Sequence, residues 1–574
     1  MNIFENYLKK ILEIISKKTK DLNIDKNINF DGIIFEIPPE NFDYDLSSNI
    51  SLILAKKSGQ NPRNLATLIK SFLLKNLDDF REIEVAGPGF LNFRFTEKAK
   101  EKIVLEILKT KNKYGSNLKN LKYNIEFVSA NPTGPMHVGH CRGAIYGDVL
   151  ANLLKFNGNK VVKEYYINDY GNQIKNFAKS VFLRIREIKY NERFISKEDL
   201  YPGEYIIDIG KKIIESNKNE KFDNFDETLQ LLKAESLRHS MNLIKSDLKE
   251  LGIEHDYFFS ETDLIEKKLV DKAINQLKKN NYVQEGFLEP PKGETDKNWK
   301  KTKKLIFKST LFGDDSDRAM QKNDGSWTYF ANDVGYHMDK VNRNYKYLIN
   351  VLGADHTGYV KRITAAVSAL SKNKIKLNCK VCQLVKLYKN GKPFKMSKRA
   401  GDFISAQDLL NEVNKDSIRF MMLNRSNDVE LDFDFDKVLE KSKDNPVFYV
   451  QYSFARISSL FRTLNKDLND KINLDLKLFS LNENEIKILR KIFEWPKIIE
   501  TASSKYEPHK IPYYLYELAT LFHSYWSKGN EDEKFKFIKN GKIKDKSTLL
   551  IIKTVALIIE NGMKILGVSL PKKM

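Results

Sequence analysis

The spacing of hydrophobic residues near the start of this 574-residue chain predicts a separate small domain. Apolar residues recur there at i, i+3, i+4 and i+7, as in a helix with one buried face; they are Leu8, Ile11, Leu12 and Ile15. A second helical stretch, PRNLATLIKSFLLKNL, precedes IEVAGPGFLNFRF, where apolar and polar residues alternate around a Gly-Pro-Gly turn as in paired strands. We therefore expect an α+β domain over residues 1–110 and a polar linker at 109–120.

The pattern changes at Tyr123. YNIEFVSA is typical of a strand, CRGAIYGDVLANLLKF of a helix that ends at an Asn-Gly turn, and KVVKEYYIND of a second strand. A strand, a helix and a strand in this order predict a parallel sheet, and hence an α/β domain over residues 120–410. Helical patterns and polar runs interrupt it, so we expect an inserted subdomain at about 171–330. The apolar stretches KLIFKS and YLINVLG indicate that the sheet then resumes.

Helical patterns dominate the end of the chain. VFYVQYSFARISSLFRTL, IPYYLYELATLFHSYW and STLLIIKTVALIIENGMKIL all have helical spacing. They predict an all-α domain over residues 411–574, whose many aromatic residues we interpret as core.

Charge adds a candidate partner. The chain carries 97 Lys and Arg against 76 Asp and Glu, a formal net charge of +21. Such a surplus favours a polyanion such as nucleic acid, because each neutralised phosphate releases counterions. A general bias of this Lys-, Asn- and Ile-rich composition is the alternative interpretation.

Nothing in the sequence predicts a membrane protein or a disulfide-rich fold. The most apolar stretch, LLIIKTVALIIE, is short and contains Lys553. The opening residues do not have the pattern of a signal peptide, and only three cysteines occur. We expect a cytoplasmic protein.

Two of the chain's 8 histidines lie three positions apart in NPTGPMHVGHCRGA, between the first predicted strand and its helix. Ligands bind at the carboxyl ends of parallel strands, and the first N–H groups of a helix attract phosphate. Gly139 and Gly143 would let a nucleotide approach the backbone. We therefore interpret His137 and His140 as phosphate-binding residues. A zinc site would require H-E-x-x-H spacing and a third ligand, which are not visible.

A second polar stretch, NGKPFKMSKRAGDF, contains Lys395, Ser397 and Lys398. Lysines on a loop can hold a triphosphate and stabilise the charge that develops on the leaving pyrophosphate. A K-x-S-K run alone is weak evidence, since most lysine clusters are only solvated. Together with H-x-G-H in a parallel α/β domain it indicates nucleotidyl transfer.

HVGH and KMSK resemble the two signature motifs of class I aminoacyl-tRNA synthetases. The stretch EFVSANPTGPMHVGHCRGAIYGD, with SKRAG, DNPVFYVQY and ILGVSLPKKM, resembles the arginyl-tRNA synthetase family over nearly the whole chain. The resemblance implies a Rossmann-like catalytic domain, an N-terminal domain that contacts tRNA and a C-terminal anticodon-binding domain. It also implies ATP-dependent formation of arginyl-adenylate and transfer of arginine to the 2′-hydroxyl of the terminal adenosine of tRNA(Arg).

The resemblance further implies ATP with Mg²⁺ as substrate, no organic cofactor, no structural zinc or other bound metal, and a monomer. Activation that requires bound tRNA is a further implied property. The residues implied in catalysis are His137, His140, Lys395, Ser397 and Lys398. Those implied in ATP binding are His137, Gly139, His140, Gly353, Lys395, Met396 and Lys398.

Arginine recognition requires acids and aromatic rings, because a guanidinium group has five donors in a plane and no acceptor. The resemblance places this role on Glu126, Ser129, Asn131, Tyr329, Asp333 and Asp355. Glu126 lies in an otherwise apolar strand, which argues against simple surface solvation. Tyr329 and Asp333 are four residues apart and would share one face of a helix. Asp355 stands where family members often have glutamine.

The family pattern also suggests contacts to tRNA at Phe90 and Asn92, in the N-terminal domain, and at Tyr449 and Gln451, near the anticodon-binding domain. Many family members lack the second lysine of KMSK and carry one before the histidine turn instead. Here NPTGPM has no lysine and Lys398 is present, so the loop supplies this cation.

Other functions fit the sequence less well. A cysteinyl-type synthetase would require a zinc thiolate site, whereas Cys379 and Cys382 form a single C-x-x-C that we interpret as small buried residues. Small nucleotidyltransferases share H-x-G-H but are short. A synthetase-derived RNA-binding protein would not need the intact histidines and lysines.

Overall fold

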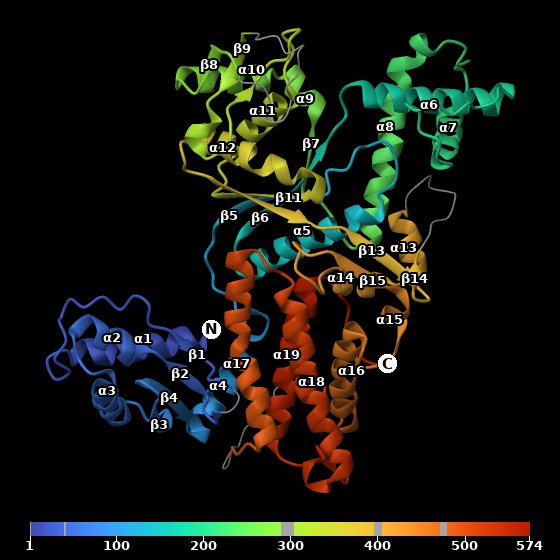
Figure 1. Ribbon diagram of the computed structural model, residues 1–574. Helices are drawn as coiled ribbons and strands as arrows, with labels where there is room; N and C mark the ends of the chain where they lie inside the picture. Colours follow the sequence, from blue (N-terminus) through green and yellow to red (C-terminus); the bar gives the residue numbers. More distant parts are fainter. Residues whose placement is uncertain (1, 40–41, 289–302, 395–403, 471–478) are drawn as a thin grey trace. The chain divides into compact units, whose positions relative to one another are not determined.

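The computed structural model describes residues 2–39, 42–288, 303–394, 404–470 and 479–574 (Figure 1). The chain forms two compact units. One contains residues 119–440, and the other combines residues 1–118 with residues 441–574. Lys395, Met396, Ser397 and Lys398 of the KMSK motif lie outside the described residues.

A five-stranded parallel sheet is the centre of the 119–440 unit, as the strand-helix-strand pattern predicted. Its order is β12-β11-β5-β6-β7. The strands are β5 (Lys122–Glu126), β6 (Lys160–Ile167), β7 (Tyr257–Ser260), β11 (Tyr347–Gly353) and β12 (Lys376–Cys382). The strand order reverses direction at β5, which has β6 on one side and β11 on the other. Such a reversal is where open α/β sheets bind ligands.

Three helices connect the central strands. Helix α5 (Val138–Phe156) joins β5 to β6, α11 (Tyr329–Asn342) precedes β11, and α12 (Val360–Ser371) joins β11 to β12. Helix α5 is buried around most of its circumference, because twelve of its residues are inaccessible. A second hydrophobic core joins α11 and α12 to α10 (Leu269–Lys279). These contacts hold the ends of β5 and β11 in fixed positions.

The stretch between β6 and β11 adds two smaller assemblies (Figure 1). Helices α6 (Asn172–Tyr190), α7 (Tyr205–Ser216) and α8 (Phe225–Glu250) share a core of their own around Phe177, Ile185 and Ile206. A three-stranded antiparallel sheet follows, of order β10-β9-β8, with β8 (Val283–Gly286), β9 (Lys304–Phe307) and β10 (Arg318–Ala319). Between them, β7 belongs to the main parallel sheet, and α9 (Glu261–Glu266) follows it directly.

One strand assignment from the sequence was wrong. KLIFKS was expected to continue the parallel sheet, but its strand β9 pairs antiparallel with β8 and β10. A short apolar run shows that a strand is buried without specifying its neighbour. YLINVLG does return to the parallel sheet as β11.

Another small sheet leads into and out of the KMSK stretch. Strand β13 (Val385–Lys389) pairs antiparallel with β14 (Lys392–Pro393) and parallel with β15 (Leu431–Asp434). Helices α13 (Ala406–Glu412), α14 (Lys415–Met422) and α15 (Phe435–Leu439) accompany it, and the 3₁₀ helices η2 (Ser309–Phe312) and η3 (Ala354–Tyr359) complete the unit.

The second unit is built from both ends of the chain. Its N-terminal part packs four helices on an antiparallel sheet of order β1-β2-β4-β3. The elements are α1 (Ile3–Lys17), β1 (Phe35–Glu36), β2 (Leu46–Ser48), α2 (Ile50–Ser58), α3 (Pro62–Asn76), β3 (Phe80–Ala86), β4 (Phe90–Phe95), α4 (Glu97–Thr110) and η1 (Lys111–Lys113). The predicted α+β fold is confirmed.

The C-terminal part is a helical bundle with one short hairpin. It contains α16 (Pro446–Thr463), α17 (Glu483–Lys505), α18 (Lys510–Glu531), η4 (Glu533–Phe535), β16 (Ile538–Lys539), β17 (Lys542–Ile543) and α19 (Lys546–Leu566). The aromatic residues Tyr514, Phe522 and Tyr525 are at most 1% exposed, so their interpretation as core is confirmed. Across the described parts of the chain, no helix is long and apolar enough to cross a membrane.

Candidate active site

The two histidines lie side by side where β5 passes into α5. His137 is the residue before the helix and His140 is in its first turn. Their rings stack with centroids 3.6 Å apart, and the His137 N–H donates to Nδ1 of His140 at 3.3 Å. Burial lowers the pKa of His140 to about 3, with a smaller contribution from His137, and burial also lowers the pKa of His137. Both rings are therefore neutral at pH 7, and each can donate one N–H group to a ligand.

Gly139 makes room for this stack. A Cβ atom on Gly139 would lie 2.9 Å from Cε1 and Nδ1 of His137, closer than such atoms approach one another. Gly143, one turn further on, differs, because a Cβ there would meet only Val351 at 3.8 Å. Gly139 therefore leaves the space that the His137 ring occupies.

The loop between β5 and the histidines has a strained backbone. Val128 and Ser129 have φ angles of 70° and 42°, in a region that β-branched residues rarely adopt. The Ser129 hydroxyl donates to Oε1 of Glu126 at 3.2 Å and accepts from the N–H of Tyr166 at 3.1 Å. Side chains of this loop are thus held at the carboxyl end of the sheet. Asn131 lies beyond them, and its Oδ1 accepts from Asn168 at 3.2 Å.

A cluster of acidic side chains around Asp333 and Glu261, called the acid pocket below, adjoins this loop. Asp333, on α11, accepts a hydrogen bond from the hydroxyl of Tyr359. Burial raises the pKa of Asp333 to about 7, and the charge of Glu126 adds to this effect. Burial also raises the pKa of Glu261 to about 7, with Asp333 and Asp169 as further causes. Carboxyl groups that have lost their hydration and have other acids nearby are stabilised as carboxylates when a cation binds.

Glu126 is neutralised within the protein. It forms an ion pair with Lys340, which is fully buried on α11 and also donates to Oδ1 of Asn350 at 3.2 Å. Asp333 and Glu261 therefore face any bound cation more directly than Glu126 does. Tyr329 is 81% exposed at the start of α11, with the Lys322 ammonium 5.4 Å from its ring centre.

Sequence reasoning missed Glu261, Asp169 and Tyr359. Glu261 directly follows β7, so its position at the carboxyl end of a parallel strand was the available signal. The four-residue β7 was hidden among helical patterns in the expected insertion. Asp169 accepts hydrogen bonds from Ser260 at 2.5 Å and from the N–H of Thr262 at 2.9 Å, which ties it to the same edge.

Both flanks of the KMSK stretch are attached to described elements. Before it, the N–H of Phe394 donates to Leu387 on β13 at 2.8 Å. After it, Ile404 and Ala406 exchange 2.8 Å backbone hydrogen bonds with Val138 and Met136, beside the histidines. The chain that leaves the KMSK stretch is therefore hydrogen-bonded to the histidine turn.

The remaining candidates are more dispersed. Gly353 ends β11, and Asp355, two residues later in η3, is exposed and lies 3.2 Å from His356. Phe90 and Asn92 lie on β4, where Asn92 is 3% exposed, and Tyr449 and Gln451 lie on α16. The Tyr449 ring contacts His523 at 4.2 Å, and Gln451 donates to Ser569 at 3.0 Å.

Cys379 and Cys382 occupy positions i and i+3 of β12, so their side chains point to opposite faces of the sheet. Burial raises the pKa of both thiols to about 12. Neither cysteine shares a cluster of three metal-ligating residues in the described ranges.

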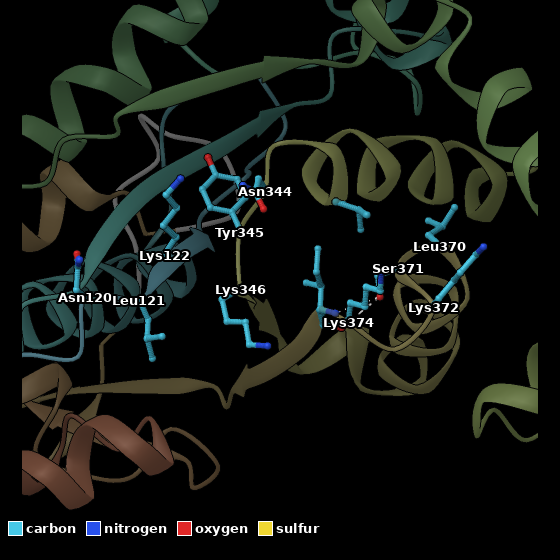
Figure 2. Close-up of a pocket in the computed structure, with 12 residues that line it drawn as sticks. Asn120, Leu121, Lys122, Asn344, Tyr345, Lys346, Leu370, Ser371, Lys372 and Lys374 are labelled. Carbon is cyan, nitrogen blue, oxygen red and sulfur yellow. Dashed lines mark hydrogen bonds between the residues drawn. The ribbon is translucent and has the colours of Figure 1, made fainter.

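A cavity of about 690 Å³ opens at the opposite, amino-terminal edge of the sheet (Figure 2). Its lining includes Lys122, Lys346, Lys372 and Lys374 but no acid. Two of these lysines follow the end of α12, where carbonyl groups favour cations. The cavity therefore lies away from the histidine turn and the acid pocket.

The chain matches three family models. The model of the class I (R) tRNA synthetase catalytic domain matches residues 103–460, the arginyl-tRNA synthetase N-terminal domain residues 5–95, and the DALR anticodon-binding domain residues 450–574. A parallel sheet with stacked histidines at its carboxyl edge, joined to a helical anticodon-binding domain, defines a class I aminoacyl-tRNA synthetase.

Relatives give the specificity. The chain is 54% identical to the arginine–tRNA ligase of Pelagibacter ubique and 43% identical to that of Bartonella bacilliformis, each over 100% of both chains. The structure of Thermus thermophilus arginyl-tRNA synthetase matches 99% of this chain and 100% of its own length with a TM-score of 0.71 at 18% identity, which bears on the fold alone. The chain belongs to the arginyl-tRNA synthetase family.

Proposed function

We propose that the acid pocket and the histidine turn together perform the arginine–tRNA ligase reaction. The protein attaches L-arginine to tRNA for translation, with ATP as the second substrate. The reaction has two steps: arginine and ATP form arginyl-adenylate and pyrophosphate, and the arginyl group then passes to the 2′-hydroxyl of the terminal adenosine. The observation that carries this proposal is that Glu261, which is 7% exposed, and the partly buried Asp333 lie at the same edge of the sheet as the histidine turn, with no ion pair to either acid among the described residues.

Asp333 and Glu261 bind the guanidinium group in this proposal. A guanidinium donates in a fixed planar fork, so carboxylates from two different elements can each accept from it. Tyr359 orients Asp333, and Tyr329 packs against the bound side chain. A lysine substrate has one compact ammonium group and cannot bridge the two acids in the same way, which gives the selectivity for arginine.

The other end of arginine lies toward β5. Ser129 and Asn131 contact the amino-acid end and the adenylate region, and Asp355 assists from η3. Glu126 accepts a hydrogen bond from Ser129 and thereby orients it, and Lys340 neutralises the charge of Glu126. This arrangement directs the substrate carboxylate toward the histidine turn.

ATP binds with its phosphates at the start of α5, where the helix dipole favours anions. His137 and His140 donate hydrogen bonds to phosphate oxygens, and Gly139 and Gly353 allow close approach of the nucleotide. Lys395, Met396, Ser397 and Lys398 complete the ATP site, and the lysines stabilise the charge of the leaving pyrophosphate. No protein nucleophile is required, so positioning and electrostatics carry the catalysis.

Mg²⁺ enters with ATP and neutralises phosphate charge. Phe90 and Asn92 contact the tRNA body, and Tyr449 and Gln451 contact it near the anticodon. The family resemblance supports a monomer in the cytoplasm and an activation step that requires tRNA.

Charging assays with unfractionated tRNA, ATP, Mg²⁺ and each labelled amino acid test this function. We expect arginine alone to be attached. Attachment of another amino acid would be consistent with the fold and the ATP chemistry but would contradict the proposed binding of arginine by Asp333 and Glu261. Binding of tRNA without charging would contradict the enzymatic function.

A further inference from the structure

Arg142 is a buried cation in the second turn of α5, five residues after His137. It is 2% exposed, and its guanidinium donates to three backbone carbonyls of the described residues. Nη1 donates to Gln383 at 2.9 Å and to Val429 at 2.7 Å, and Nη2 donates to Ser426 at 2.8 Å. One side chain thus connects α5 to two other segments of the chain.

Each of these two segments directly precedes a strand of the small sheet that contains β13 and β15. Gln383 lies between β12 and β13, and residues 426–429 precede β15. The two segments are also hydrogen-bonded to each other, through the N–H of Gln383 to Asn427 at 2.8 Å and through Asn427 Nδ2 to Val381 at 2.8 Å. Arg142 therefore fixes the start of the β13–β15 pair against α5.

The bonding of Arg142 is unusual for a buried arginine. Buried charges are normally paired, as Arg419 is with Asp148 at 2.5 Å. Arg142 makes its three described hydrogen bonds with backbone carbonyls instead. Burial lowers the pKa of its guanidinium, and nearby Cys382 and Asp428 oppose this. Hydrophobic residues would satisfy packing at lower cost, so the three-point connection itself requires an explanation.

That explanation lies in what the small sheet supports. Strand β13 continues through β14, which ends at Pro393, two residues before Lys395. On the far side of the KMSK stretch, Ile404 and Ala406 bond directly to the histidine turn. The outgoing flank is thus attached to α5 by its backbone, and the incoming flank through Arg142.

We propose that Arg142 is a positioning residue for the ATP-dependent step. Its guanidinium fixes the β13–β15 pair against α5 and thereby sets the position of the chain leading to Lys395 and Lys398 relative to His137 and His140. The inference rests on the proposed function of these four residues. Arg142 itself touches no substrate.

The test compares Arg142→Gln and Arg142→Lys with the parent enzyme. Glutamine loses the fork and the charge, whereas lysine keeps the charge and part of the donor set. We expect Arg142→Gln to raise the KM for ATP and lower kcat for charging by about tenfold or more, because small misplacements of catalytic groups have such effects. The KM for arginine should change less than about twofold, and Arg142→Lys should recover part of the loss.

Arg318→Gln is a control for the loss of an arginine contact to a buried group elsewhere in the same unit. Arg318 pairs with Asp314 at 2.7 Å in the antiparallel sheet of the same unit. Its removal should lower the thermal unfolding temperature without raising the KM for ATP. Equal effects of Arg142→Gln and Arg318→Gln on ATP and arginine parameters would overturn the inference. Where Arg142→Gln does not fold, the same comparison is made with Arg142→Lys.

The double variant Arg142→Gln with Lys398→Ala distinguishes a positioning role of Arg142 from a general effect on protein stability. If Arg142 acts through the KMSK stretch, the double variant should lose much less than the product of the two single effects. A fully multiplicative loss would overturn the inference. A Lys398→Ala enzyme that charges arginine at the parental rate would instead overturn the proposed role of Lys398, and the KM for ATP of Arg142→Gln then decides the inference alone.

Discussion

At the scale of single residues, the acid pocket predicts how arginine binding depends on pH. Burial raises the pKa of both Asp333 and Glu261 to about 7. The charge of Glu126 adds to the shift of Asp333, and the charges of Asp333 and Asp169 add to that of Glu261. A bound guanidinium favours the carboxylates, so binding releases protons below about pH 7. We expect the Kd for arginine to rise as the pH falls from 8 to 6, by about tenfold over this whole range for each carboxyl group that must lose its proton.

Calorimetry in buffers of different ionisation enthalpy measures both the Kd and the number of protons. Glu261→Gln should bind arginine more weakly and release fewer protons. A Kd that stays constant over this pH range in the parent enzyme would contradict the proposed role of these acids.

A second prediction concerns the loop lysine. Lys398→Ala should lower the rate of arginine activation by a factor of roughly 10² or more, the usual scale for losing a contact to transition-state charge. Lys386→Ala is the matched control, because Lys386 is an exposed lysine on β13 that pairs with Glu430 at 2.6 Å. Pyrophosphate exchange with tRNA present measures the rate, and a change within a few-fold for Lys398→Ala would contradict the assignment.

The sequence named one acid of this pocket, Asp333, and predicted that it shares a helix with Tyr329. Four-residue spacing placed Tyr329 and Asp333 on one helix, and α11 contains both. Glu261 could not be found in this way, since it approaches Asp333 only through the pairing of β7 with β6. The order of the strands in the sheet brings Glu261 close to Asp333, and the local spacing of residues does not specify that order.

At the scale of elements, alanine substitutions at two glycines near the start of α5 should have different effects on charging. Alanine is a better helix former than glycine by about 1 kcal/mol. Gly143→Ala should therefore be neutral or stabilising and leave charging unchanged, because its Cβ makes an ordinary contact with Val351. Gly139→Ala should displace the His137 ring and lower charging by about tenfold or more, because its Cβ would overlap that ring.

Steady-state charging and thermal unfolding of the two variants decide this prediction. A Gly139→Ala enzyme with the activity of Gly143→Ala would show that the orientation of the His137 ring is not required. The motif alone predicted glycines for the approach of a nucleotide; the structure adds that Gly139 serves the neighbouring histidine.

At the scale of the whole molecule, the sequence predicted the kinds of fold but not how the chain ends combine. Residues 1–118 form one compact unit with residues 441–574. Arg490 on α17 pairs with Asp45 at 2.9 Å across 445 positions, and the Trp495 indole donates to the carbonyl of Tyr114 at 3.0 Å. The partners in each pair are distant in the chain. The local sequence around Arg490, Asp45, Trp495 or Tyr114 therefore does not indicate that the residue has such a contact.

The net charge of +21 predicts that the affinity for tRNA depends on salt concentration. If lysine and arginine side chains neutralise tRNA phosphates, the apparent affinity for tRNA must fall with salt, with a log–log slope of about −0.7 to −0.9 for each phosphate contacted. We expect the KM for tRNA to rise steeply between about 50 and 200 mM salt, whereas the Kd for arginine, set by a buried pocket, should change little because buried charges are weakly screened. Charging kinetics at several salt concentrations provide the slope, and hence the number of phosphates. A KM for tRNA that does not change with salt would show that the surplus charge is a general feature of the composition and takes no part in binding tRNA.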